Sequence, residues 1–332
     1  MVIVHSYLMA VLLCFLTMLC WGSWANTQKL AGRKWPFQLY YWDYAMGVFL
    51  LSLLLAFTLG SMGSAGRSFL ADFHQADSGA LGSAFLGGVI FNLSNILLVA
   101  AIDIAGMAVA FPIGVGLALV LGVITTYLTK PEGDPILLFL GVAGVVVAIL
   151  LDALAYRRLS SGRQTTSKGI AISVAAGVLM GFFYRFVVAA MSTDFVRLQA
   201  GKLSPYTALV FFSAGLLVSN FLWNTLVMWK PFSGEPVPFG DYFRKGDIRL
   251  HGIGILGGVI WSLGMSLSII ASGAAGPAIS YGLGQGATMV AAFWGVFIWK
   301  EFQNAPKGTE KLLTLMFIAY AAGLILLIAA RS

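Results

Sequence analysis

Long uninterrupted apolar stretches constrain this chain more than any other feature of its sequence. A helix needs about twenty predominantly apolar residues to cross a bilayer. Ten stretches of the 332-residue chain are long enough, at roughly 4–25, 40–60, 80–102, 105–128, 135–156, 169–190, 206–229, 252–271, 275–299 and 312–330. The runs are continuous rather than alternating, which favours helices over barrel strands. We therefore predict an all-α polytopic membrane protein with ten transmembrane helices.

The composition excludes other classes of protein. Hydrophobic residues make up 59% of the chain and charged residues only 10%, too little polar surface for a soluble enzyme and far too apolar for a disordered chain. The net charge of +7 does not indicate nucleic acid, because the basic residues are spread over short loops. Cys14 and Cys20 lie six residues apart in one span, so we expect neither a disulfide nor a metal site. No cofactor is implied.

The loop charges predict an orientation. Fourteen of the twenty Lys and Arg residues fall in the loops after spans 1, 5, 7 and 9, and five fall on the opposite side. Basic loops stay in the cytoplasm, so we expect both termini outside. We take the cytoplasmic (inner) membrane as the default location.

An internal repeat is the strongest architectural signal. Segment 86–128 aligns without gaps on segment 256–298 and is identical at 13 of 43 positions, where composition alone would give roughly four. The two segments are five spans apart, an odd number, so they cross the membrane in opposite directions. Inverted repeats are typical of transporters whose substrate binds near the bilayer midplane. We predict a 5+5 inverted repeat, with one five-helix repeat over 1–156, a basic cytoplasmic linker over 157–168 and a second repeat over 169–332.

Neutral polar and aromatic side chains predict the substrate site. Amide groups both donate and accept hydrogen bonds, and aromatic faces cover the flat side of a sugar or heterocycle. The first candidates are Asn92, Asn95, Trp261, Tyr281 and Gln285, and further candidates are Trp24, Arg185 and Asn220. The alternative is that the amides only join helices to one another.

Charged residues inside spans are functional candidates because burying charge in a bilayer is costly. Arg185 either contacts the substrate or extends outward towards Asp194. Asp43 is the candidate for proton coupling, although it also lies in an aromatic segment typical of the membrane interface. We interpret Asp152 as a partner of Arg157 and Arg158, and the three histidines as loop or helix-end residues.

Glycine runs in spans 4 and 9 allow two interpretations. They could break the helix and expose backbone groups to substrate, or they could allow close helix packing. We favour packing. Paired carboxylates, a His–carboxylate pair and metal motifs are missing from the spans, so we do not expect an intramembrane enzyme. A receptor or scaffold would leave the repeat unexplained.

Several segments resemble known transporters. Residues 20–26 (CWGSWAN) resemble the first helix of the glucose/ribose porters and ureide permeases, and residues 106–110 (GMAVA) resemble the L-rhamnose–proton symporter. Segments 256–261 and 295–301 show the same likeness. These groups belong to the drug/metabolite transporter superfamily, and the resemblance implies secondary active uptake of a small neutral solute, often with protons.

The expected function is therefore solute uptake by alternating access, at a site between spans 3, 4, 8 and 9. We predict a monosaccharide, ribose or glucose, as substrate, with proton symport. A ureide or nucleobase such as allantoin or uracil is the alternative, and metabolite export is a further one. The expected partners are this small molecule, protons and the lipid bilayer.

Overall fold

The computed structural model describes residues 1–32, 35–159 and 166–331, and over these residues the chain is helical. The long helices are α1 (Tyr7–Ser23), α3 (Phe37–Phe57), α5 (Ser78–Ala105), α6 (Met107–Thr129), α7 (Pro135–Leu159), α8 (Ser167–Ala190), α9 (Pro205–Trp229), α11 (Ile248–Ala275) and α14 (Thr309–Ala329). The short ones are α2 (Ala25–Ala31), α4 (Phe69–Gln75), α10 (Gly240–Arg244), α12 (Pro277–Gly284), α13 (Ala287–Phe293) and the π-helical η1 (Trp294–Ile298). The described residues contain no named strand, only two isolated bridges.

The predicted ten-helix membrane architecture is confirmed. Ten helical segments are long and apolar enough to cross a membrane. Helices α1 and α2 together form one of them, and α12, α13 and η1 together form another. Their outward faces carry large apolar side chains, such as Leu128 at 75% and Ile325 at 65% exposure, as expected of surfaces that contact lipid rather than water.

Local sequence signals position several helix starts. A side-chain oxygen at the N-cap accepts a hydrogen bond from a backbone N–H of the first turn at Ser6, Thr166, Ser204 and Asp247. Such caps satisfy N–H groups that have no partner within the helix. These caps lie at span ends, where the chain enters the apolar region.

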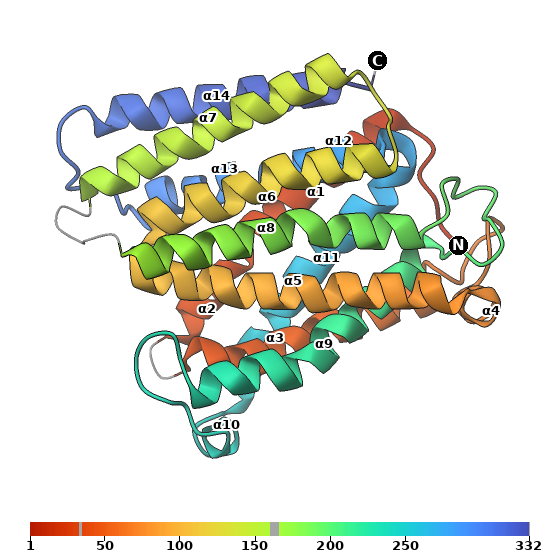
Figure 1. The fold of residues 1–332 in the computed structure, drawn as a ribbon, viewed down its shortest axis with the longest axis horizontal. Helices are drawn as coiled ribbons and strands as arrows, with labels where there is room; N and C mark the ends of the chain where they lie inside the picture. The colour runs from red at the N-terminus through yellow and green to blue at the C-terminus, as the bar shows by residue number, and fades with distance from the viewer. Residues whose placement is uncertain (33–34, 160–165, 332) are drawn as a thin grey trace.

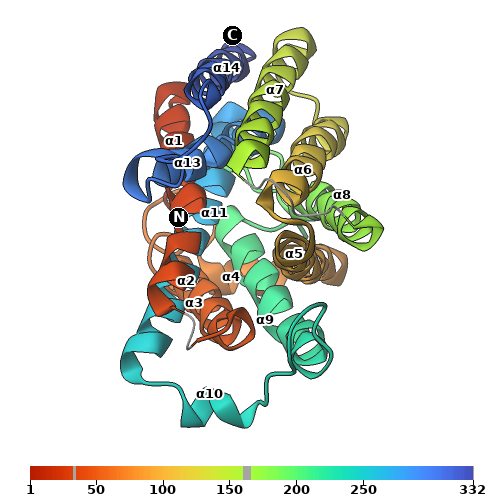
Figure 2. The same ribbon diagram turned by 90° about the vertical axis from the view of Figure 1, so that its left-hand side faces the viewer.

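The spans run side by side, and the connecting segments collect at the two ends of the bundle (Figure 1). We call one end the outer end, after the predicted orientation. It carries both termini, α4, and segments 130–134 and 191–204. The inner end carries α2, α10 and segment 299–308. Helices α7 and α14 pack together along one side of the molecule, and α10 lies at the opposite side (Figure 2).

Helices α5 and α11 correspond to each other. Each is 28 residues long, and each ends at a glycine with positive φ, Gly106 (φ 81°, ψ 160°) and Gly276 (φ 86°, ψ 144°). This conformation favours glycine, since it lacks a Cβ. The two glycines are separated by the same offset as the sequence repeat, so the same turn leads from α5 into α6 and from α11 into α12.

The packing follows the same correspondence. Helix α5 packs on α8 and α9, while α11 packs on α1 and α3. A Cβ on Gly88 would overlap the backbone oxygen of Phe212 in α9, and one on Gly258 would overlap that of Tyr44 in α3. These pairs are those that a 5+5 repeat predicts, and the inverted symmetry itself stays a prediction. The predicted linker over 157–168 lies partly outside the described residues, and Arg157 and Arg158 belong to the last turn of α7.

Candidate substrate site

Four aromatic rings meet midway along the bundle. Phe91 and Trp261 each lie at the middle of their helix, α5 and α11, and their ring centroids are 4.5 Å apart. Phe212 of α9 contacts both, at 5.7 Å from Phe91 and 6.0 Å from Trp261. Tyr44 of α3 lies 6.4 Å from Trp261. We call these four residues the aromatic centre; both predicted repeats contribute to it.

Helix α1 covers one side of the aromatic centre with two tryptophans. The Trp21 ring stacks on that of Trp261 at 6.0 Å and 15°, and Trp21 Nε1 donates to the Trp261 carbonyl at 3.2 Å. The Trp24 ring lies 4.9 Å from that of Tyr44. Flat apolar faces of this kind are suited to a planar or ring-shaped solute.

Buried amides lie beside the aromatic centre. Asn92 follows Phe91 on α5; its Nδ2 donates to Ser219 Oγ at 2.9 Å, while its Oδ1 lacks a hydrogen-bond partner among the described residues. Asn95 Nδ2 donates to the hydroxyl of Tyr41 at 3.1 Å. Asn220 is fully buried, and neither its Nδ2 nor its Oδ1 has a partner within the described part of the chain.

Asn220 lies on the face of α9 that packs on α3. One turn further along α9, Asn224 Nδ2 donates to the Gln38 carbonyl at 2.8 Å. Two turns the other way, Ser213 Oγ lies 2.5 Å from Ser52 Oγ. Between these two anchors α9 faces residues 38–52 of α3. A buried amide without partners costs about 1–3 kcal/mol for each unpaired group, and a ligand or a water that pairs with it removes this cost.

Tyr281 lies to the side of the aromatic centre rather than in it. Its hydroxyl donates to the carbonyls of Ala118 at 3.2 Å and Met180 at 3.4 Å, and its ring packs against Tyr184 at 5.0 Å. It therefore joins α12 to α6 and α8. Phe183, 6.3 Å from Tyr281 and 5.1 Å from Phe91, connects it to the aromatic centre.

Gln285 lies at a break in the ninth span. Helix α12 ends at Gly284 and α13 begins at Ala287, and the Gly286 N–H bonds to the Leu283 carbonyl in a tighter turn. A Cβ on Gly284 would lie 2.8 Å from Trp21 Cζ3. The glycines of this span thus both break the helix and allow close packing, so packing alone was an incomplete interpretation. Span 4 is one continuous helix, α6.

Arg185 lies apart from the aromatic centre. Its side chain is exposed on α8, and its guanidinium lies over the ring of Phe186 at 5.8 Å. It points out of the bundle, and the structure does not place it among the candidate site residues. The outward direction was one of the two alternatives for this residue, because a long cationic side chain near a span end reaches towards the interface. The expected pair with Asp194 is not among the ion pairs of the described residues.

Asp43 forms a cluster at the inner end. The fully buried carboxylate accepts a hydrogen bond from the Tyr242 hydroxyl at 2.5 Å, and His251 Nδ1 lies 3.0 and 3.1 Å from its two oxygens. Burial raises the pKa of the Tyr242 phenol, and the hydrogen bond to Asp43 and its negative charge raise it further. Tyr242 therefore stays protonated and acts as a donor. The Trp35 ring lies 5.1 Å from that of His251 and covers the cluster.

Asp152 is also buried, but the arginines that we expected beside it lie elsewhere. Neither Arg157 nor Arg158 forms an ion pair with it in the described chain, and its Oδ1 lacks a hydrogen bond there. Both arginines are exposed. The neighbouring acid is Glu301, which accepts from Tyr156 at 2.7 Å and pairs with Lys29 at 2.9 Å. The interpretation of Asp152 as an arginine partner was wrong, because the last turn of α7 turns those side chains to the surface.

The structure brings four of the candidates together and adds others. Trp261 belongs to the aromatic centre, Trp24 contacts its Tyr44, and Asn92 follows Phe91 on α5. Asn95 is joined to the centre through Tyr41 and Tyr44, whose rings stack at 5.0 Å. Asn220 lies on α9, eight residues from Phe212. Sequence reasoning missed Tyr41, Tyr44, Phe91 and Phe212. It had assigned the tyrosines of span 2 to an interfacial belt, and phenylalanines are too common in spans to be singled out. His251 was assigned only as a helix-end residue, yet it pairs with Asp43.

Comparison with known proteins identifies relatives over nearly the whole chain. The sequence model of the ureide permease family matches residues 40–166 and 156–330. Ureide permease 1 of Arabidopsis thaliana is 22% identical over 96% of both chains, and ureide permease 2 is 24% identical over 99% of this chain and 98% of its own. The probable ureide permease A3 of Vigna unguiculata is 22% identical over 90% of this chain. One protein of known crystal structure has the same fold, with a TM-score of 0.58 at 17% identity over 97% of both chains.

These matches first define a class: the protein is a membrane transporter of small solutes and not an enzyme. Within that class the chain belongs to the ureide permease family. Of the groups that the sequence resembles, this family is supported, whereas the sugar porters and the rhamnose symporter are not.

Proposed function

We propose that this protein takes up a ureide or a nucleobase-like solute, with the aromatic centre and its neighbouring amides as the binding site. Family membership favours this alternative over the monosaccharide that we first expected. The observation that carries the proposal is the buried amide of Asn220, which has an unpaired donor and acceptor in a neutral, aromatic site.

The chemistry of the solute matches these groups. A ureide is a derivative of urea and presents N–H donors next to carbonyl acceptors in one plane. An asparagine amide offers the complementary pair, and the free Oδ1 of Asn92 offers one more acceptor. Aromatic faces at Trp261 and Tyr44 would cover the flat solute. A charged group is not needed for a neutral solute, and none of the residues of this site is charged.

Proton coupling belongs to the same proposal, at Asp43 and His251. His251 Nδ1 lies 3.0 Å from an Asp43 oxygen, so one proton that enters this pair is shared between the imidazole and the carboxylate. The cluster joins α3 to α10 and α11, so its protonation would bear on whether the inner end stays closed.

Alternating access between two inverted repeats is the motion that we propose. It is supported by the equal lengths of α5 and α11, by the matching turns at Gly106 and Gly276, and by ring contacts between the corresponding residues Phe91 and Trp261. In transporters of this design, two repeats rock about a site at their interface.

Uptake into proteoliposomes tests the proposed substrate. We expect uptake of labelled allantoin or uracil, stimulated by an inward proton gradient, and no uptake of labelled ribose or glucose. Liposomes without protein are the control. Uptake of ribose or glucose with no uptake of allantoin or uracil would overturn the ureide proposal. Uptake of a ureide without gradient stimulation would overturn proton coupling and leave a facilitator.

A further inference from the structure

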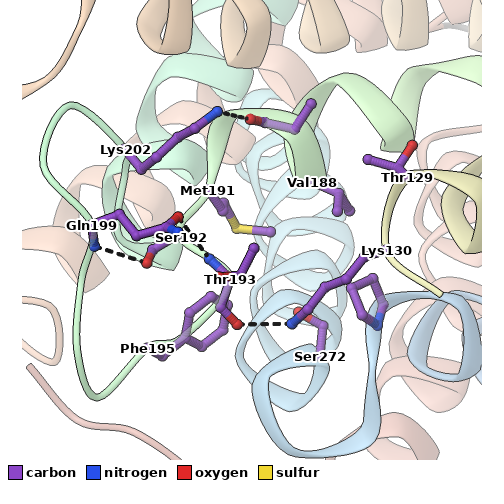
Figure 3. A pocket seen from close by; sticks show the side chains of 12 residues that line it. Thr129, Lys130, Val188, Met191, Ser192, Thr193, Phe195, Gln199, Lys202 and Ser272 are labelled. Carbon is purple, nitrogen blue, oxygen red and sulfur yellow. Dashed lines mark hydrogen bonds between the residues drawn. The ribbon is translucent and has the colours of Figure 1, made fainter. Parts of the chain in front are cut away.

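A cavity opens at the outer end of the bundle, whereas the Asp43 cluster lies at the inner end. It has a volume of about 280 Å³ and lies between the ends of α6 and α8, the start of α12 and segment 191–202. Figure 3 shows Lys130 and Lys202 at its rim. Their ammonium groups already donate to the carbonyls of Thr193 and Ala189, at 2.8 and 2.7 Å. The remaining polar lining is neutral, with hydroxyls from Thr129, Ser192 and Ser272.

A column of small hydroxyl and thiol groups leads inward from this cavity. Ser272 lines the cavity, and Ser268 follows it one turn deeper on α11. Ser268 Oγ lies 3.2 Å from Ser280 Oγ of α12, and Cys14 Sγ of α1 lies 3.6 Å from the same Ser280 oxygen. Thr17, almost one turn deeper on α1, donates to the Gly264 carbonyl at 3.0 Å. We call these residues, together with Tyr184, the hydroxyl column.

The column ends at the aromatic centre. Trp21 lies one turn beyond Thr17 on α1 and stacks on Trp261. With a rise of 1.5 Å per residue, Cys14 lies about 10 Å below the outer end of α1, and Trp21 lies about 10 Å deeper. The rows of side chains on α1 and α11 therefore connect the cavity to the candidate site without a gap.

Tyr184 adds a buried phenol to this column. It lies one turn below the cavity residue Val188 on α8 and is fully buried. Its hydroxyl lies among those of Ser268, Ser272 and Ser280, yet it has no hydrogen bond of good geometry in the described chain. A buried hydroxyl without a partner is costly unless a ligand or water satisfies it.

We propose that the cavity and the hydroxyl column form the outer entry route, which takes a neutral hydrogen-bonding solute from the outer face to the aromatic centre. This inference rests on the proposed transport function. The ladder of neutral donors and acceptors replaces the water that the solute loses, and the two lysines stay at the rim, where their ammonium groups donate to carbonyls of the outer end. Opening requires α1 and α11 to move apart from α12 at the contacts of Cys14 and Ser268 with Ser280.

The native thiol of Cys14 tests the route directly. In a Cys20→Ser variant, Cys14 is the single thiol, and in this structure it is buried. We expect an impermeant sulfonatoethyl methanethiosulfonate reagent, added at the outer face, to form a mixed disulfide with Cys14 that protein mass spectrometry detects. A ureide at ten times its Kd should slow the reaction about tenfold, because only the unoccupied fraction reacts.

Two neighbouring valines of α8 provide a matched control in a cysteine-free background. Val188 lines the cavity, whereas Val187 is buried against Gly87 of α5. We expect Val188→Cys to react and Val187→Cys to remain unmodified. An inert Cys14 beside a reactive Val188→Cys would overturn the route, as would equal reaction at both valine positions. Since labelling does not depend on uptake, ureide uptake with an inert Cys14 would reject only the route. Protection of Cys14 by ribose instead of a ureide would reject only the substrate.

Discussion

Asn220 is fully buried, and neither polar atom of its amide has a partner in the described chain. We use this combination to distinguish a residue proposed to bind substrate from one that joins two helices. Asn224 is buried on the same face of α9, but its Nδ2 donates to the Gln38 carbonyl and only its Oδ1 lacks a partner in the described chain. The two amides had looked alike in sequence as an i, i+4 pair. Only their partners differ, and partners depend on the neighbouring helix α3.

Asn220→Leu should weaken transport without weakening the fold. Losing the paired donor and acceptor should raise the KM for the solute at least tenfold, since one such hydrogen bond is worth about 1–3 kcal/mol. The free energy of unfolding should stay the same or rise by about 1 kcal/mol, because two buried unpaired atoms are removed. Uptake kinetics and thermal melting in detergent measure both effects. Asn224→Leu is the matched control and should lower the melting temperature. An unchanged KM in Asn220→Leu would remove Asn220 from the site.

The Asp43 cluster gives a prediction about coupling. Asp43→Asn and His251→Gln should abolish stimulation by a proton gradient while leaving solute counterflow intact, because each removes one member of the pair that we propose to carry the proton. Tyr242→Phe should keep the stimulation. Burial and Asp43 raise the pKa of Tyr242, so its hydroxyl remains protonated across the physiological range and carries no transferable proton. Loss of stimulation in Tyr242→Phe alone would contradict this assignment.

At the scale of elements, glycines decide how closely the central helices approach. Gly88 lets α5 lie against the backbone of α9, and Gly258 lets α11 lie against that of α3. Both contacts bring a residue of the aromatic centre, Phe212 or Tyr44, against the neighbouring helix. Close helix approach at small residues is the usual basis of packing in membranes.

Gly88→Ala and Gly258→Ala should destabilise the protein by similar amounts, about 1–3 kcal/mol each, because the added Cβ meets backbone that cannot rotate away. The controls are Gly82→Ala and Gly252→Ala, at equivalent points of α5 and α11 where a Cβ meets no atom within 4 Å. These should gain about 0.5–1 kcal/mol from better helix propensity. Thermal melting of the four variants measures the effect. Clearly unequal losses at Gly88 and Gly258 would argue against equivalent repeats.

At the scale of the whole molecule, the orientation in the membrane remains to be tested. Segment 191–204 and α10 lie at opposite ends of the bundle (Figure 1), and the positive-inside rule places the first outside and the second in the cytoplasm. Val196 and Phe243 are 53% and 72% exposed in these regions, so each can be replaced without disturbing the core.

In a background free of Cys14 and Cys20, Val196→Cys should react with an impermeant thiol reagent on intact cells. Phe243→Cys should react only after the membrane is permeabilised. Quantitative labelling followed by gel or mass analysis is the measurement. The reverse pattern would place both termini in the cytoplasm and would invert the direction of the proposed entry route.

The sequence by itself determined the class of fold. Ten apolar runs specify ten spans because bilayer thickness sets helix length, and no partner is needed to recognise them. The shared pattern of 86–128 and 256–298 likewise anticipated the matching turns at Gly106 and Gly276. Asn92 and Asn220 were recognisable as candidates, since polar groups at mid-span are rare and costly, and Trp261 because its aromatic face suits a flat solute.

Only the tertiary structure decided which of these groups act together. In the folded protein Arg185 points out of the bundle, and the Tyr281 hydroxyl donates to carbonyls of α6 and α8. His251 contacts Asp43, which lies more than two hundred residues away in the chain. The tertiary structure also assembled the aromatic centre from Phe91, Tyr44 and Phe212, which no local pattern distinguished. The physical reason is that inside a bilayer all spans are similarly apolar, so hydropathy specifies that a helix spans but not which face meets which neighbour. That choice depends on close contacts such as those at Gly88 and Gly258, and these exist only once the helices have packed.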